Sequence, residues 1–272
     1  MSGENRLLAT VVQSAIFRTR GLSRTRPFPS KLVFPGLSGG QPIWNNYMDK
    51  YHKHIGATLR ENYDAIREDY ENLCAASSMG ENSDYVDEEH RLHSGDWSWQ
   101  SYMQKGEVSG DFASKCPNTV NILEGFSHHP VLLDQVDGEE ARGEKCQSLF
   151  KGLPFGYAFF SSMGPKSAIE PHYGPCNFRV RCHFPLIVPS GGDCGMEIGG
   201  KEIKWEQGKP IFFDDSYSHH VWNRSIETRV VLLFDIWHPE LERDEIDAIK
   251  DMFAFLKDAE KEERERSGSR AG

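Results

Sequence analysis

Three blocks in the C-terminal half decide the fold: PHYGPCNFRVRCHFPLIVP (171–189), GKPIFFDDSYSHHVWN (208–223) and TRVVLLFDIWHP (228–239). Each joins a short apolar or β-branched run to Gly, Pro, Asn or Asp, a pattern typical of strands connected by turns. Similar runs, GYAFFSSM, GMEIG and EIKWEQG, lie before and between them. So many short strands in succession predict a closed or sandwiched antiparallel fold.

The first block contains a strand with one polar and one apolar face. Arg179, Arg181 and His183 alternate with apolar residues, and alternate residues of a strand share a face. The adjoining FPLIV run is apolar throughout, as in a buried strand. Buried arginines require a balancing anion. A dicarboxylate inside a barrel would supply it, and the alternative is an exposed basic edge strand.

Two histidines on separate strand-like segments, His172 and His219, are followed by Arg229. Two neutral imidazoles can hold Fe(II), and an arginine further along a barrel can bind the distal carboxylate of 2-oxoglutarate. The set therefore suits an iron- and 2-oxoglutarate-dependent oxygenase. His219 and His220 must point to opposite faces of an extended segment, so only one of them can be a ligand.

The carboxylate that many such iron sites place two residues after the first histidine is absent, because Gly174 stands there. On chemistry alone this leaves a zinc site or a structural histidine open. Asp214 and Asp215 precede the second histidine. They are candidates for metal ligands, turn formers or acceptors for an imidazole N–H.

The stretch from about residue 34 to 241 resembles the aspartyl/asparaginyl β-hydroxylase family. The resemblance rests on the three blocks and on FPGL (34–37), GDWSW (95–99) and SSM (161–163). It implies a mainly β fold with flanking helices around a double-stranded β-helix core, of the jelly-roll or cupin-like kind. It also implies that His172 and His219 alone hold the iron, with a glycine at the carboxylate position.

The resemblance further implies the residues around the co-substrate. Ser161, Arg181, His183 and Arg229 would contact 2-oxoglutarate, and Met163 would line the same pocket. The implied activity is an Fe(II)- and 2-oxoglutarate-dependent dioxygenase that uses O2 to hydroxylate an unactivated carbon and releases succinate and CO2. The implied target is Cβ of Asp or Asn in a peptide or protein, with a free amino acid or a lipid acyl chain as alternatives.

Two other classes compete with this reading. A non-catalytic barrel that binds or scaffolds would be expected to have lost part of the histidine–arginine set. A zinc cupin acting as an isomerase or hydrolase has no use for Arg181 and Arg229 together. The net charge of −10 gives no field that attracts nucleic acid. No apolar run approaches the ~20 residues of a membrane-spanning helix. We therefore expect a small-molecule, peptide or protein substrate as partner, and neither nucleic acid nor a membrane span.

Three regions are expected along the 272 residues. Residues 1–35 form a basic tail that is either disordered or a mitochondrial transit segment. We expect a cytoplasmic protein, with mitochondria as the alternative if the tail is a transit segment. Residues 36–241 form the catalytic domain, with N-terminal helices and a barrel from about residue 154. Residues 242–272 form a C-terminal helix and a charged tail.

Within the catalytic domain, an apolar period of three and four from Ile43 to about residue 76 predicts helices, with Gly56 as a break. A short helix is predicted over Thr119–Phe126, and polar loops over 75–95 and 134–144. The six cysteines form no CxxC pair, and we expect free thiols. Only Cys116 lies just before NILEGF, so the disulfide that the animal enzyme of the family carries there is not expected.

Overall fold

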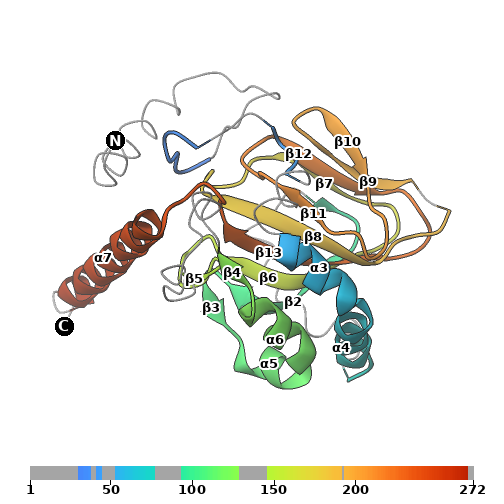
Figure 1. Cartoon of the computed structure of the whole chain (residues 1–272), viewed down its shortest axis with the longest axis horizontal. Helices are drawn as coiled ribbons and strands as arrows, with labels where there is room; N and C mark the ends of the chain where they lie inside the picture. Colours follow the sequence, from blue (N-terminus) through green and yellow to red (C-terminus); the bar gives the residue numbers. More distant parts are fainter. Residues whose placement is uncertain are drawn as a thin grey trace, which may run out of the picture.

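Eight consecutive strands, β6 to β13, build the core of the molecule (Figure 1). The computed structural model describes residues 30–37, 41–44, 53–76, 93–128, 146–191 and 193–268. The strands are β6 (Tyr157–Met163), β7 (Ser167–His172), β8 (Arg179–Ile187), β9 (Cys194–Ile198), β10 (Lys201–Lys204), β11 (Ile211–Phe213), β12 (His219–Asn223) and β13 (Arg229–Trp237).

These strands are divided between two antiparallel sheets, with the orders β11-β8-β13-β6 and β7-β12-β9-β10. Three more strands extend the sheets. The first sheet continues through β2 (Trp97–Gln104) to β3 (Glu107–Val108), and β1 (His93–Ser94) pairs with β7. This order is that of a double-sheet jelly roll, the architecture of cupins. The predicted double-stranded β-helix is confirmed.

The central strands β8 and β13 carry different residues on their two faces. The even-numbered residues of both belong to one apolar cluster with the helices: Val180, Cys182, Phe184, Leu186, Val230, Leu232, Phe234 and Ile236. The odd-numbered residues include Arg179, His183, Arg229 and Asp235, and these are also buried. Because β8 lies between β11 and β13, the alternative of an exposed basic edge strand is wrong.

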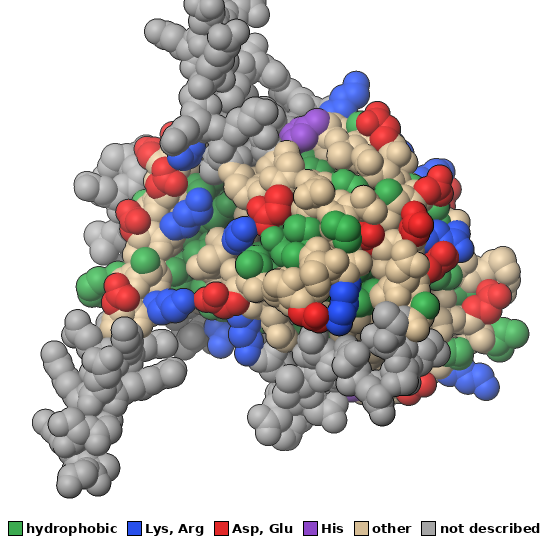
Figure 2. Space-filling model, turned by 90° about the horizontal axis from the view of Figure 1, so that it is seen from below, with side chains coloured by type: hydrophobic (Ala, Val, Ile, Leu, Met, Phe, Trp, Pro, Cys, Tyr) green, Lys and Arg blue, Asp and Glu red, His purple; other side chains and the backbone are tan. Residues whose placement is uncertain are grey.

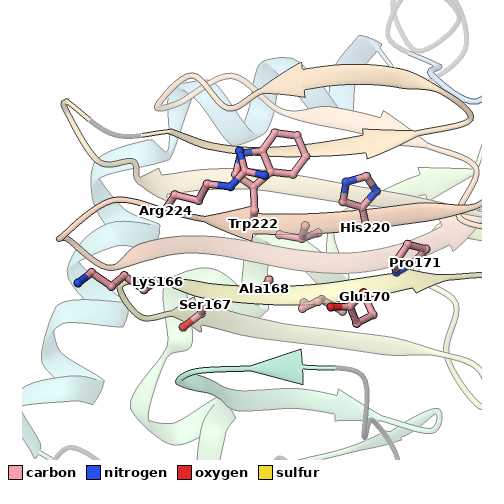
Figure 3. A pocket seen from close by; sticks show the side chains of 10 residues that line it. Lys166, Ser167, Ala168, Glu170, Pro171, His220, Trp222 and Arg224 are labelled. Carbon is pink, nitrogen blue, oxygen red and sulfur yellow. The ribbon is translucent and has the colours of Figure 1, made fainter.

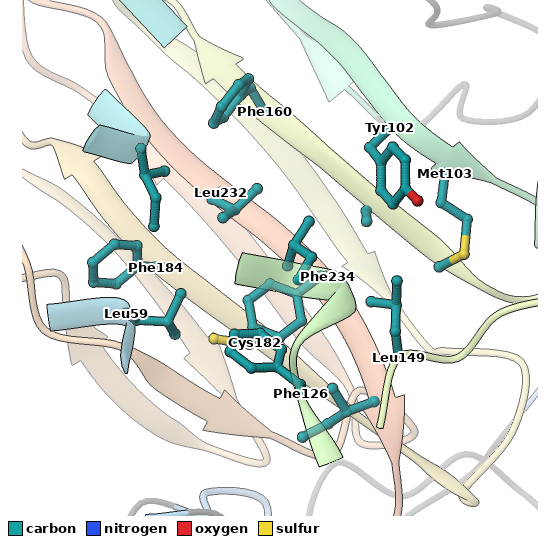
Figure 4. Close-up of a cluster of buried hydrophobic side chains, with 14 of the residues drawn as sticks. Leu59, Tyr102, Met103, Phe126, Leu149, Phe160, Cys182, Phe184, Leu232 and Phe234 are labelled. Atoms are coloured by element: carbon teal, nitrogen blue, oxygen red, sulfur yellow. The ribbon is translucent and has the colours of Figure 1, made fainter. Parts of the chain in front are cut away.

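Four helices cover the outer face of the six-stranded sheet (Figure 1). They are α3 (Lys53–Glu61), α4 (Tyr63–Ala76), α5 (Gly110–Lys115) and α6 (Pro117–Glu124). In Figure 4, Leu59 of α3 lies with Phe184 and Cys182 of β8 and with Phe234 of β13. Burial of such side chains is the main stabilising contribution in a fold of this kind. The helix predicted near Thr119 is confirmed as α6.

The predicted start and break of the N-terminal helices are wrong. Ile43 forms an antiparallel bridge with Phe213 of β11, so this residue pairs with the edge of a sheet and is not part of a helix. The first described helix starts at Lys53, and residues 45–52 lie outside the described residues. Gly56 is buried inside α3, and the break falls at Asn62. The Asn62 side-chain amide donates to the Thr58 carbonyl at 2.8 Å, a local bond that competes with helix continuation.

Residues 30–35, which the sequence placed in the tail, pack on the barrel. The Ser30 N–H donates to the Gly174 carbonyl at 2.8 Å, and Leu32 forms a parallel bridge with Cys176. The Asn177 amide bonds both the N–H and the carbonyl of Phe34, at 2.7 and 2.9 Å. The domain therefore includes residue 30, and the predicted boundary at 35 is too late. The tail before residue 30 and the loops predicted at 134–144 and over most of 75–95 lie outside the described residues.

The C-terminal helix α7 (Arg243–Gly268) confirms the helix predicted there. Its first turns are anchored because Ile246 and Ile249 are buried against Trp237, and its remainder extends away from the barrel (Figure 1). No helix among the described residues is long and apolar enough to cross a membrane. On the face in Figure 2, acidic and basic side chains are interspersed.

The small sheet of β4 (Ser127–His128) and β5 (Cys146–Gln147) lies beside the helical layer. The side chain of Cys146 is not among those described. Five cysteines are free thiols, as predicted: Cys74, Cys116, Cys176, Cys182 and Cys194.

Candidate metal and carboxylate site

The sheet register brings the two predicted metal ligands together. His172 of β7 is the direct cross-strand partner of His219 of β12, and the ring centroids are 4.0 Å apart. The register shifts between His219 and Val221, because Val221 pairs with Ile169. A β-bulge of this kind re-aims a side chain, and here it places His172 rather than Pro171 opposite the second histidine. Proline is tolerated in a bulge because it has no N–H to pair.

Backbone carbonyls orient both rings. Nδ1 of His172 bonds the Glu170 carbonyl at 2.8 Å, and Nδ1 of His219 bonds the Tyr217 carbonyl at 2.9 Å. A carbonyl can only accept, so each Nδ1 carries the proton and each Nε2 keeps its lone pair for a metal. Burial is the main cause that lowers the pKa of both histidines. Both rings are therefore neutral near pH 7, the form that binds metal.

The neighbouring histidine faces away from this pair. His220 lines a shallow hollow on the outer face of the sheet together with Trp222, Arg224 and Glu170, as Figure 3 shows. Its ring lies 5.4 Å from that of Trp222. Within the described residues, no group of three or more His, Cys, Asp or Glu side chains is arranged to hold a metal ion. The pair His172 and His219 therefore stands without a third protein ligand there.

The side chain of Asp215, which comes from another segment, fills the space beside Gly174 where a side chain of residue 174 would lie. A Cβ atom at Gly174 would lie 2.4 Å from the Asp215 Cγ, far inside contact distance. The Gly174 N–H also donates to the Asp215 carbonyl at 2.6 Å. Glycine is required there because the Asp215 side chain occupies the space that any side chain at residue 174 would need.

Two buried aspartates neutralise the arginines of β8. Arg181 donates to both oxygens of Asp235 at 2.8 and 3.0 Å and lies 3.4 Å from Asp215. Arg179 pairs with both carboxylates and donates to the Phe155 carbonyl. Burial alone would raise the Asp215 pKa, but the two arginines hold it below its usual range. The balancing anions are therefore the protein's own, and the argument that these arginines need a bound dicarboxylate is wrong.

The first aspartate of the DD pair is a turn former. Asp214 accepts the Ser216 N–H at 2.9 Å, and its own N–H donates to the Pro42 carbonyl at 2.9 Å. Burial raises the pKa of Asp214 to about 7, and the charge of Asp215 adds to this shift. The protonated form of Asp214 is therefore favoured relative to an ordinary aspartate.

Arg229, at the start of β13, is buried without a carboxylate partner among the described residues. Its guanidinium donates to the carbonyl and the hydroxyl oxygen of Ser161, both at 3.3 Å, and contacts the Met163 sulfur at 3.6 Å. The ring of Trp205 lies 4.6 Å from Cζ. Burial lowers the pKa of Arg229 to about 10. A buried cation with only neutral neighbours is a receptor for an anion.

Two further side chains surround this receptor. The Trp97 indole donates to the Ser161 hydroxyl oxygen at 2.9 Å, so that oxygen accepts from both Trp97 and Arg229 and its own proton is left for a ligand. Sequence reasoning missed Trp97 as a site residue, although GDWSW marked it for the family resemblance. His183 is buried, and its Nδ1 has no hydrogen-bond partner among the described residues. Burial and the Arg229 charge hold its pKa well below the ordinary value.

A chain of ring contacts links the histidine pair to the carboxylate receptor. Phe213 lies 6.0 Å from His219 and 4.9 Å from His183, and His183 is the neighbour whose pKa the Arg229 charge lowers. The predicted residues thus fall into two adjoining groups. His172 and His219 form one, and Ser161, Met163, His183 and Arg229 form the other. Arg181 belongs instead to the ion-pair network with Asp215 and Asp235.

Known proteins resemble the region that contains this site. Residues 144–239 match the family model described as Aspartyl/Asparaginyl beta-hydroxylase. The chain is 30% identical over 201 residues to human aspartyl/asparaginyl beta-hydroxylase, an alignment that covers 74% of this chain and 23% of that protein. It is 39% identical over 169 residues to mouse aspartate beta-hydroxylase domain-containing protein 1, covering 55% of this chain and 45% of that protein. The chain thus spans less than half of the length of either relative.

Among solved structures, a prolyl-4-hydroxylase from Pseudomonas putida aligns with a TM-score of 0.35 and 11% identity, over 68% of this chain and 98% of that one. The region of this chain that holds both histidines and Arg229 is thus similar in sequence to the aspartyl/asparaginyl β-hydroxylase family.

Proposed function

We propose that this chain is an Fe(II)- and 2-oxoglutarate-dependent dioxygenase that hydroxylates an unactivated carbon. The observation that carries the proposal is the combination of two oriented, neutral imidazoles with a buried guanidinium that has no carboxylate partner in the part of the chain that the structure describes. The sequence similarity supports a hydroxylase, because the relatives are named beta-hydroxylases.

The histidine pair fits a divalent iron. His172 and His219 would hold Fe(II) through Nε2, since Nδ1 of each is committed to a carbonyl. Imidazole suits iron, and these two side chains would be the protein's ligands to it. When bound, Fe(II) supplies the oxygen activation that couples conversion of 2-oxoglutarate to succinate and CO2 with hydroxylation of the substrate.

The residues around Arg229 would bind and orient the co-substrate. Arg229 would hold the distal carboxylate of 2-oxoglutarate, and the Ser161 hydroxyl would donate to the same group. Met163 and neutral His183 would complete the wall. Arg181 is the less buried member of the arginine pair, at 14% exposure, and would contact the co-substrate while it stays paired with Asp235 and Asp215. A water-poor lumen strengthens each of these contacts.

For the substrate, we propose Cβ of an Asp or Asn residue in a peptide or protein. The names of the relatives support this choice, and a free amino acid or a lipid acyl chain are the alternatives that the same chemistry allows. Incubation with Asp- and Asn-containing peptides, followed by mass spectrometry for the gain of one oxygen, separates these substrate classes.

The function is tested by measuring succinate formed from 2-oxoglutarate with Fe(II), ascorbate and O2. We expect turnover by the parent, loss of turnover and of bound iron in His172→Ala and His219→Ala, and both retained in His220→Ala, because His220 faces outward. Succinate that does not form in the parent, although iron binds, would favour a non-catalytic barrel. Activity that survives in His219→Ala but not in His220→Ala would overturn the ligand assignment.

A further inference from the structure

The loop after β10 places one aromatic ring against the carboxylate receptor. Trp205 is buried, at 4% exposure, in the apolar cluster that also contains Met163, Phe213 and Val221. Its ring lies 4.6 Å from the Arg229 Cζ and 6.0 Å from the ring of His183, with an interplanar angle of 32° in the second pair. It therefore touches two of the proposed co-substrate residues.

Several buried nitrogen atoms around Trp205 lack hydrogen-bond partners among the described residues. The Trp205 Nε1, the Arg229 Nε and the His183 Nδ1 are all buried, and none has a hydrogen-bond partner among the described residues. Unpaired polar atoms inside a protein are costly unless a ligand or water satisfies them. Trp205 lies beside both of the other residues, so the three nitrogens together suit an oxygen-rich ligand.

We infer that Trp205 is a positioning residue for 2-oxoglutarate, holding the Arg229 guanidinium so that its donors meet the distal carboxylate. The inference rests on the proposed function. A guanidinium with no carboxylate to fix it keeps rotational freedom, and the 3.3 Å bonds to Ser161 are long. A ring face within about 6 Å attracts the cation and restricts its plane. A guanidinium that is already held in place loses less conformational entropy when the ligand binds, so the ligand binds more tightly.

A second tryptophan provides a matched control. Trp222 also has a guanidinium over its ring, with the Arg224 Cζ at 5.3 Å. It belongs to the hollow on the outer face of the sheet (Figure 3). Replacing Trp205 removes one cation–π contact, and replacing Trp222 removes two, with Lys204 and Arg224. Each replacement removes one large ring, but only Trp205 contacts the proposed co-substrate residues.

The test compares Trp205→Leu, Trp205→Phe and Trp222→Leu. In protein loaded with Mn(II) and kept free of O2, calorimetry of 2-oxoglutarate binding should show affinity weakened about twofold to thirtyfold by Trp205→Leu. Trp205→Phe keeps a ring face and should restore most of the loss, and Trp222→Leu should leave affinity unchanged. In the iron-loaded enzyme, Trp205→Leu should raise the 2-oxoglutarate KM while kcat at saturation changes little.

A double-mutant cycle separates positioning from mere packing. If Trp205 acts through Arg229, then Trp205→Leu should cost much less affinity in an Arg229→Lys background than in the parent. Additive losses, or unchanged affinity in Trp205→Leu, would overturn the inference. The phenylalanine variant keeps the test valid if the leucine variant fails to fold.

One measurement needs no co-substrate. The NMR signal of the Arg229 Nε–H should be shifted by the ring current of Trp205 in the parent and should move in Trp205→Leu. A parent that shows this shift but binds no 2-oxoglutarate would reject the proposed function while leaving the stacking intact. Absence of the shift would reject the inference itself.

Discussion

The barrel lumen contains two kinds of buried arginine, and they differ in what neutralises them. Arg179 and Arg181 share Asp215 and Asp235, which are both fully buried. Arg229 has a hydroxyl, a carbonyl, a thioether and an aromatic face around it. Burial leaves the pKa of Arg229 below its usual range, whereas the aspartates outweigh burial and raise that of Arg179. Arg179 and Arg181, the balanced pair, therefore maintain the structure. Arg229, the unbalanced arginine, can bind a ligand.

The largest effect is expected from breaking the balanced pair. Asp235→Ala should lower the free energy of unfolding by about 3–5 kcal/mol, because it leaves buried guanidinium groups with one carboxylate between them. Urea denaturation measures the loss. Asp193→Ala is the matched control, since Asp193 pairs with Lys204 and Arg224 at the surface. Its effect should be much smaller because exposed ion pairs contribute little. Equal losses in the two variants would remove the distinction between the arginine sites.

Removing the unbalanced arginine should affect binding and leave stability intact. Arg229→Ala should weaken 2-oxoglutarate binding by about 1.5–3 kcal/mol, so the concentration for half-maximal turnover rises about tenfold to a hundredfold. Arg229→Lys should recover only part of this, since an ammonium cannot form the two-pronged contact. Arg229→Met should melt no lower than the parent, because it removes an unpaired buried charge. An unchanged co-substrate requirement in the alanine variant would refute the assignment.

A smaller loss of stability is expected from a substitution at Gly174 that displaces Asp215 from Arg179 and Arg181. Gly174→Ala would place a methyl group 2.4 Å from the Asp215 Cγ, so Asp215 must shift away from its arginines. We expect a loss of about 1–3 kcal/mol in the free energy of unfolding, as for other overpacked sites. Gly191→Ala is the control, because a Cβ there has no neighbour within 4 Å. If both variants melt alike, the Asp215 side chain is not confined as described.

The smallest effect concerns pH and the aspartate beside the network. Asp214 has a pKa of about 7 when folded, above its ordinary value of 3.8, so the folded state binds its proton more tightly than the unfolded state does. The stabilisation is complete below about pH 4 and is lost as pH rises through about 7. The Tm difference between parent and Asp214→Asn should therefore decline across this range. A difference that stays constant with pH would show that Asp214 does not titrate there.

The period-2 patterns of the sequence were sufficient for most of the barrel. The alternation around Arg179 and Arg181 correctly predicted a covered polar face, and the adjacency of His219 and His220 correctly predicted opposite orientations. These predictions succeed because alternation is a local property of an extended chain. Ile43 shows the limit: its apolar side chain fits a helical period, but it pairs with Phe213, far away in the sequence.

The counter-ions were missed for a similar reason. Asp235 lies directly opposite Arg181 in the β13–β8 register, and Asp215 comes from the turn after β11. Neither placement can be read without the sheet order. A signal was nevertheless present, because Asp235 is a lone acid in the apolar run TRVVLLFDIW, and a buried acid needs a cation. Trp97 carried no such signal, since its bond to Ser161 depends on the β2–β6 pairing.

The bulge in β7 has a consequence for how this strand can change in length. Between the pairs His172–His219 and Ile169–Val221, β7 has one residue more than β12. Deleting Glu170 or Pro171 would remove the bulge and leave the histidine two positions after Ile169, opposite His219 in simple register and on the same face as Ile169. Loop insertions are absorbed at the surface. The segment from Ile169 to His172, although it is part of a strand, should therefore tolerate the loss of one of its two middle residues with the histidine pair kept.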